Sequence, residues 1–335
     1  MSAQAGRPYI EVRDLARHFD VSKPLLNRVI EGQPRLILKA VDGIDFAIRK
    51  GETLSLVGES GCGKSTAGRA ILRLIEPDAG EIVYRGQDVR AASGAALRAL
   101  RRKLQIVFQD PYSSLNPRRS IGRALAEPIE VHGIAGSAQE VRARVASLLE
   151  EVGLPADAAE RYPHEFSGGQ RQRIGIARAL SVEPELIVAD EPVSALDVSI
   201  QAQVLELMRR LQAQRGLSFV FIAHDLGVVR YFCQRVAVMY LGRIVEMGTA
   251  AELFGDPLHP YTRMLRDASP VPDPALRGRM PRIEGETPSP ANPPSGCHFH
   301  PRCPHAMPAC RERYPEETRV GGRMVACHLH SPGGG

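Results

Sequence analysis

The chain has 335 residues, 43% of them hydrophobic, which is enough for one large globular domain or two smaller ones. No stretch approaches the roughly 20 apolar residues of a membrane-spanning helix, and the polar segment 1–14 lacks the apolar region of a secretory signal. We therefore expect a cytoplasmic protein, for which any membrane role needs partner subunits. The net charge of +5 comes from dispersed basic residues, so we predict no nucleic-acid partner.

Predicted strands and helices alternate along the first 250 residues. Strands are predicted at 10–19, 40–48, 54–57, 82–84, 104–108, 186–189 and 219–223, helices at 67–74, 138–152, 170–180 and 200–211, and a hairpin at 236–245. A polar insertion at 20–36 separates the first two strands. Strands that alternate with helices are typical of an α/β core with a parallel-rich sheet.

The segment 58–66 reads Gly-Glu-Ser-Gly-Cys-Gly-Lys-Ser-Thr and matches the phosphate-binding pattern G-x-x-x-x-G-K-[ST] between a predicted strand and a predicted helix. Glycines let backbone N–H groups surround an anion, and the helix N-terminus adds partial positive charge. Lys64 can reach the β- and γ-phosphates of a nucleotide, and the Ser65 hydroxyl can ligate Mg²⁺. The predicted nucleotide-binding residues of this loop are Gly58, Glu59, Ser60, Gly61, Cys62, Gly63, Lys64, Ser65 and Thr66.

Asp190 and Glu191 directly follow the apolar strand predicted at 186–189. An acidic residue at the end of a buried strand can hold Mg²⁺ directly or through water, and we assign this role to Asp190. Glu191 is predicted to orient and deprotonate the attacking water as a catalytic base. Two adjacent acids also occur at helix N-caps, but the phosphate-binding loop upstream favours the catalytic interpretation.

A second anion-binding pattern lies at Phe166-Ser167-Gly168-Gly169-Gln170, where a serine and two glycines precede a predicted helix. The chain thus carries two phosphate-binding surfaces, although ATP has only one γ-phosphate. The segment resembles the Leu-Ser-Gly-Gly-Gln signature of ATP-binding cassette (ABC) ATPases, with Phe166 in place of leucine as the apolar anchor. The resemblance implies that Ser167, Gly168, Gly169 and Gln170 contact ATP bound by a second subunit.

Further positions resemble cassette motifs in the order found in this family. Gln109 resembles the Q-loop glutamine, which implies contact with Mg²⁺, and Asp197 in Ser194-Ala195-Leu196-Asp197 resembles the D-loop aspartate. His224 resembles the switch histidine, which implies a catalytic contact to the γ-phosphate. Phe19 is the candidate for the aromatic ring that stacks on adenine, and a core phenylalanine is an equally good interpretation.

The resemblance implies the fold, the domain and the cofactors. The fold is an α/β P-loop NTPase of the ABC ATPase type, with a parallel-rich sheet, an antiparallel β subdomain and a helical subdomain, over residues 8–252. The cofactors are ATP and Mg²⁺, and the activity is ATP hydrolysis coupled to transport.

Two segments resemble one branch of the family, the dipeptide/oligopeptide/nickel importers: residues 109–117 and His259-Pro260-Tyr261-Thr262. They imply an ATPase close to the F-type subunit, which energises uptake of di- or oligopeptides from the cytoplasmic side of the cell (inner) membrane. The implied partners are a second ATPase of the D type, two transmembrane permeases and an extracytoplasmic peptide-binding protein. Importers of nickel chelates or glutathione, and a soluble ABC ATPase of a phosphonate-degrading complex, stay open as alternatives.

Residues 253–335 form a predicted loop-rich extension, because 15 of the 26 prolines lie at 255–335. Four of the six cysteines gather in this extension: Cys297, Cys303, Cys310 and Cys327. In a cytosolic chain such clustering favours a metal over disulfides. Four thiolates can hold a [4Fe–4S] cluster or Zn²⁺. The wide spacing and the family resemblance favour the cluster, with zinc and four unligated thiols as alternatives.

Overall fold

The computed structural model describes residues 8–32, 34–268 and 286–331. These residues fall into two compact units. The first unit comprises residues 48–53 and 91–222, and the second comprises residues 8–47, 54–90 and the described part of 223–335. Each unit is described by itself below. Within the described ranges, no helix combines the length and the apolar character needed to span a bilayer.

The first unit contains a parallel sheet in the order β8-β7-β6. Its strands are β6 (Leu104–Val107), β7 (Leu186–Asp190) and β8 (Ser218–Ala223). Every residue of β7 is buried, as its continuous apolar sequence predicts for a central strand. The helices of this unit are α3 (Gly94–Lys103), α4 (Pro111–Ser114), α5 (Ile121–Val131), α6 (Ala138–Glu151), α7 (Gly168–Leu180) and α8 (Val198–Arg215).

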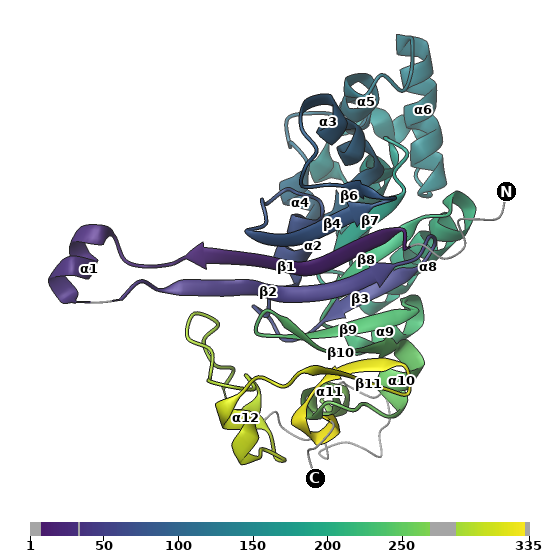
Figure 1. Cartoon of the computed structure of the whole chain (residues 1–335). Helices are drawn as coiled ribbons and strands as arrows, with labels where there is room; N and C mark the ends of the chain where they lie inside the picture. Colours follow the sequence, from purple (N-terminus) through teal and green to yellow (C-terminus); the bar gives the residue numbers. More distant parts are fainter. Residues whose placement is uncertain (1–7, 33, 269–285, 332–335) are drawn as a thin grey trace. The chain divides into compact units, whose positions relative to one another are not determined.

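The second unit contains an antiparallel group of strands in the order β2-β1-β4-β5. These strands are β1 (Ile10–Asp20), β2 (Ile37–Ile48), β4 (Ala79–Tyr84) and β5 (Gln87–Asp88). The polar insertion predicted at 20–36 includes the short helix α1 (Leu25–Glu31), which lies at the far end of the β1–β2 ribbon (Figure 1).

The second unit also contains the strand order β11-β12-β10-β9-β3, in which β3 and β9 are parallel. These strands are β3 (Thr53–Val57), β9 (Arg235–Tyr240), β10 (Arg243–Thr249), β11 (Glu317–Val320) and β12 (Arg323–Ala326). The helices are α2 (Lys64–Ile71), α9 (Leu226–Phe232), α10 (Ala250–Gly255), α11 (Pro260–Asp267) and α12 (Pro308–Glu312), with 3₁₀ turns η4 (His300–Arg302) and η5 (His328–His330).

The predicted mixed α/β fold with a parallel-rich sheet is confirmed. The hairpin predicted at 236–245 is formed by β9 and β10, and its turn residues Leu241 and Gly242 both have positive φ (43° and 83°). Helices α1, α3, α4, α5 and α9–α12 were not predicted; α5 contains Pro128 and α9 has only seven residues, which weakens the helical pattern. The division into domains at residue 252 stays a prediction.

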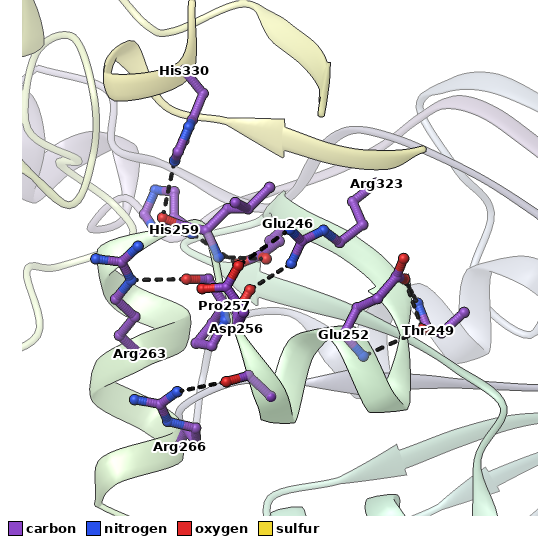
Figure 2. Close-up of polar contacts among 12 residues, drawn as sticks. Glu246, Thr249, Glu252, Asp256, Pro257, His259, Arg263, Arg266, Arg323 and His330 are labelled. Atoms are coloured by element: carbon purple, nitrogen blue, oxygen red, sulfur yellow. Dashed lines mark hydrogen bonds and ion pairs between the residues drawn. The ribbon is translucent and has the colours of Figure 1, made fainter. Parts of the chain in front are cut away.

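The C-terminal extension joins the sheet of the second unit through β12, which pairs with β10 (Figure 1). Next to this pairing, Glu246 of β10 is fully buried, and its two carboxylate oxygens accept hydrogen bonds from the backbone N–H groups of Leu258 (2.8 Å) and His259 (2.9 Å). Figure 2 shows these contacts together with those of Arg323 and His330 from the extension. A buried carboxylate that accepts two backbone bonds fixes the chain at the start of α11.

Candidate functional site

The segment 58–66 lies between β3 and α2, as predicted, and its glycines are sterically required. Gly58 and Gly63 have φ of 153° and 109°, which side chains rarely adopt. A Cβ on Gly58 would overlap the carbonyl oxygen of Met239, and one on Gly63 would overlap that of Ala40. The loop can therefore adopt this bend only with glycine at both positions. A loop bent in this way lets its backbone N–H groups surround a phosphate.

Lys64 is the first residue of α2 and is buried. Its ammonium group lies over the loop and donates hydrogen bonds to the carbonyl oxygens of Gly58 (2.7 Å) and Glu59 (3.0 Å). Ser65 and Thr66 follow in the first turn of the helix. The loop thus offers a lysine cation, a helix N-terminus and a hydroxyl, which are the groups that a nucleotide with Mg²⁺ requires.

Asp190 ends the buried strand β7 and is 2% exposed. Glu191 follows with φ of 47°, a left-handed conformation that costs a non-glycine residue about 1–3 kcal/mol. Two contacts hold it there: its backbone N–H donates to Ile222 O of β8 (3.1 Å), and Gln109 Nε2 donates to its Oε2 (2.9 Å). The structure therefore brings together three of the predicted site residues, Gln109, Asp190 and Glu191, in the first unit. Oxygen donors of this kind are those that Mg²⁺ prefers.

The second phosphate-binding motif forms the N-terminus of α7. Ser167 is the N-cap: its hydroxyl accepts from Gln170 N (3.3 Å), while Gln170 Oε1 accepts from Ser167 N (3.0 Å). Both Ser167 and Gly168 are exposed. A Cβ on Gly168 would lie 3.5 Å from Leu196 Cδ2, so the motif adjoins the D-loop segment 194–197. Asp197, the N-cap of α8, is also exposed, and Val198 beside it is 83% exposed.

Phe19 and His224 belong to the second unit, like the loop 58–66. Phe19 lies near the end of β1, is only partly buried, and has the Arg17 guanidinium 4.6 Å from its ring centroid. A partly accessible ring is compatible with stacking on adenine, whereas a core phenylalanine would be buried. His224 directly follows β8 and is exposed.

The four cysteines of the extension also belong to the second unit. Cys310 and Cys327 are buried, and Cys297 N donates to Cys310 O (2.8 Å). Burial, together with the neighbouring cysteines, raises the pKa of the Cys297 thiol to about 12. Among the described residues, no group of three or more His, Cys, Asp or Glu side chains is arranged to hold a metal ion. The described cysteine positions therefore give the predicted iron–sulfur cluster no support.

The loop 58–66 is contacted by three described residues of the extension that were not predicted as site residues: Tyr261, Thr287 and Arg302. Tyr261 accepts a hydrogen bond at its hydroxyl from Glu59 N (2.9 Å), and Arg302 forms an ion pair with the Glu59 carboxylate (2.8 Å). Tyr261 lies in the segment 259–262 that the resemblance singled out, so the sequence carried a signal for it. Arg302 has no such signal beyond its place between Cys297 and Cys303.

The comparisons with known proteins agree with this geometry. Residues 41–194 match the family described as ABC transporter, and residues 245–310 match the family described as oligopeptide/dipeptide transporter, C-terminal region. The chain is 52% identical to the putative oligopeptide transport ATP-binding protein YkfD of Bacillus subtilis over 96% of each chain. It is 50% identical to the oligopeptide transport ATP-binding protein AppF of the same organism, over 99% of this chain and all of that protein.

A solved structure gives the same assignment. The dimeric ATP-binding cassette MJ0796, solved in a post-hydrolysis state with ADP and phosphate, superposes with a TM-score of 0.62 at 28% identity. The match covers 72% of this chain and 98% of that one. Sequence and fold comparisons therefore agree with the motif geometry: the chain belongs to the ABC transporter ATPases, in the branch that carries the oligopeptide/dipeptide transporter C-terminal region.

Proposed function

We propose that this chain is an ATPase subunit of an importer that moves di- or oligopeptides across the cytoplasmic membrane. The observation that carries the proposal is the match to the oligopeptide/dipeptide transporter C-terminal region, combined with 50% identity over nearly the whole chain to a protein named as an oligopeptide transport ATP-binding protein. The chain would lie on the cytoplasmic face of the membrane and depend on two permease subunits and an extracytoplasmic binding protein.

The residues of the site have distinct roles in ATP hydrolysis. The loop 58–66 would hold the phosphates through its backbone N–H groups and Lys64. Ser65 and Asp190 would each supply an oxygen ligand to Mg²⁺, which would neutralise phosphate charge. Glu191 accepts the proton of the attacking water, and Gln109 keeps its carboxylate in place through the 2.9 Å hydrogen bond. His224 contacts the γ-phosphate.

The exposed start of α7 supports a site shared between two ATPase subunits. Ser167 and Gly168 are exposed at the start of α7, and Val198 beside Asp197 is an exposed apolar side chain. In a head-to-tail pair, segment 167–170 of one subunit completes the nucleotide site of the other. The partner would be a second ATPase of the D type, and Phe19 would stack on adenine.

The extension would carry a metal centre on Cys297, Cys303, Cys310 and Cys327. Support comes from the clustering of the four thiols in the sequence. A [4Fe–4S] cluster is proposed ahead of Zn²⁺ because the cysteine spacing is wider than in usual zinc sites. The role of this centre is structural, because a proline-rich segment with little apolar content needs a crosslink to fold.

Affinity purification of the tagged chain from membranes of its native host tests the importer proposal. Two permeases and a second ATPase should co-purify, and ATPase activity of the reconstituted complex should rise with peptide and its binding protein. Recovery of the chain in a soluble complex without permeases would overturn the proposal. If only a nickel chelate or only glutathione raised the ATPase activity, the assignment to di- or oligopeptides would be wrong, but the importer assignment would stand.

A further inference from the structure

Glu59, the second residue of the phosphate-binding loop, forms a partly buried bidentate ion pair with Arg302 of the C-terminal extension. Arg302 Nη1 lies 2.8 Å from Glu59 Oε2, and Arg302 Nη2 lies 2.8 Å from Glu59 Oε1. The side chain of Arg302 is 2% exposed and that of Glu59 is 17% exposed. The pair joins positions 243 residues apart within the second unit. Bidentate pairs of this kind are stronger and more directional than ordinary surface ion pairs.

The surroundings of Arg302 fix it in this position. The residue lies in η4, and its guanidinium carbon is 5.9 Å from the ring centroids of both Tyr240 and Phe299. Phe299 is buried and packs edge-on against Tyr240, with 5.4 Å between centroids. Arg302 Nη1 also donates to the Tyr240 hydroxyl (3.4 Å). Two aromatic rings and the hydrogen bond to the Tyr240 hydroxyl therefore favour one orientation of the guanidinium group.

Glu59 has two further contacts with the extension. Thr287 Oγ1 donates to Glu59 Oε2 (2.8 Å), and Glu59 N donates to the Tyr261 hydroxyl (2.9 Å). A cavity of about 220 Å³ is lined by loop residues 59–62 on one side and by extension residues 287–290 on the other, together with Tyr240 and Leu241. The extension therefore holds both the backbone and the side chain of Glu59.

The charge of Glu59 explains why this contact matters for phosphate binding. Burial opposes ionisation of Glu59, but the hydrogen bonds from Arg302 and Thr287 and the nearby charge of Lys64 hold its pKa below the usual range. The group is thus a carboxylate at neutral pH within the loop that is proposed to surround phosphate. Without Arg302, this carboxylate would repel a triphosphate and compete with it for the Lys64 ammonium group.

We propose that Arg302 is a positioning residue for nucleotide binding: it neutralises the Glu59 carboxylate of the loop 58–66, which would otherwise repel the phosphates of the nucleotide. The C-terminal extension is thereby a part of the nucleotide site. The proposal depends on the ATPase assignment and not on the transported solute or on a metal in the extension.

Calorimetric titration of ATP into the purified full-length chain tests this role. Arg302→Gln is expected to weaken ATP binding at least tenfold, because it leaves the Glu59 carboxylate without its cation. The double variant Arg302→Gln/Glu59→Gln should bind ATP more tightly than Arg302→Gln alone, since it removes the repelling charge as well. The loss in Arg302→Gln should also shrink as salt rises from about 50 to 500 mM, because salt screens the repulsion.

Two controls make the result decisive. The first control is Arg215→Gln, which breaks another bidentate pair, in the first unit. There, Arg215 Nε lies 2.6 Å from Glu151 Oε1, and Arg215 Nη2 lies 2.5 Å from Glu151 Oε2. This variant should leave ATP affinity unchanged. If Arg302→Gln does not fold, Arg302→Lys keeps the positive charge and should bind ATP only a few-fold more weakly than the parent. Unchanged ATP affinity in Arg302→Gln, or equal losses in the single and double variants at every salt concentration, would overturn the proposal.

Discussion

Gln109 and Glu191, which are 82 residues apart in the sequence, are joined by a hydrogen bond of 2.9 Å from Nε2 to Oε2. Glu191 has a left-handed backbone and its own N–H is bonded to Ile222 O of the neighbouring strand β8. Glu191, which directly follows the central strand, is therefore held at its backbone by Ile222 and at its carboxylate by Gln109. This arrangement suits a general base, since the direction of a catalytic carboxylate matters as much as its pKa.

Glu191→Gln should slow ATP turnover by about 10²–10⁴-fold and leave ATP binding intact, because a general base contributes about that much and the amide keeps the shape of the side chain. Steady-state hydrolysis by the reconstituted complex and ATP retention by the purified subunit measure the two properties. Glu185→Gln is the matched control, because Glu185 precedes the same strand at its other end and pairs with Lys103. Near-normal turnover in Glu191→Gln would exclude the assigned role.

Lys64→Ala should weaken nucleotide binding itself. The lysine supplies positive charge to the β- and γ-phosphates in the ground state and in the transition state alike. Calorimetry should show an increase in Kd of at least tenfold for both ATP and ADP. The control Lys103→Ala removes a lysine that pairs with Glu185 in the first unit and should bind both nucleotides normally. Unchanged affinity in Lys64→Ala would contradict the assignment of the loop.

Gly168→Asp should block the shared site without damaging the subunit. A Cβ at this position meets only Leu196 Cδ2 at an ordinary 3.5 Å, so the substitution has room, and the new carboxylate would face the γ-phosphate bound by the partner subunit. The isolated variant should bind ATP normally but should form no ATP-dependent dimer in light scattering.

Gly168→Ala is the uncharged control for this experiment and should still form a dimer. Gly169 is unsuitable for the purpose, because a Cβ there would overlap Ile200 Cγ2 and disturb the packing of α7 on α8. If isolated Gly168→Asp lost ATP binding while a mixed complex retained full turnover, the head-to-tail arrangement would be wrong.

The cysteine cluster can be tested by metal analysis of anaerobically purified protein. About four irons per chain with broad absorption near 400 nm would support the cluster, and one zinc would support the alternative. Cys327→Ser should release the metal and increase hydrogen exchange of residues 290–330, whereas Cys233→Ala, a buried cysteine outside the extension, should do neither. A preparation that contains neither metal would refute this part of the proposal.

Acidification should destabilise the second unit through His259. Burial lowers the pKa of this side chain to about 3, and its Nδ1 accepts a hydrogen bond from Tyr261 N (3.0 Å) as the N-cap of α11. The unfolded chain binds the proton more readily, so the contribution of His259 to stability is fully present above pH 6.5 and falls as the pH drops towards 3. His259→Asn, which keeps a hydrogen-bond acceptor but does not titrate, should show a smaller drop in Tm between pH 7 and pH 5.

The sequence predicted those features that have a local cause. The continuous apolar run of β7, the glycines of the loop 58–66 and the serine that caps α7 each reflect a requirement set within a few neighbouring residues. The β11–β12 hairpin was not predicted, although its Gly321-Gly322 turn, with φ of 57° and 86°, was a readable signal.

The contacts that complete the site have no local cause. The bond from Gln109 to Glu191 spans 82 residues, and the ion pair from Glu59 to Arg302 spans 243. A glutamine or an arginine at such positions is common on protein surfaces, so residue type alone does not indicate the partner. These pairs become visible only when the tertiary structure is known.

The pairing of β12 with β10 has a consequence for any attempt to shorten this protein to a minimal ATPase. A chain ended at residue 252 would leave β10 as an open sheet edge, with its backbone groups free to pair with another molecule. It would also leave the Glu246 carboxylate without the two N–H groups that now bind it. Such a fragment should self-associate into insoluble material, so the nucleotide-binding unit and its C-terminal extension have to be produced as one piece.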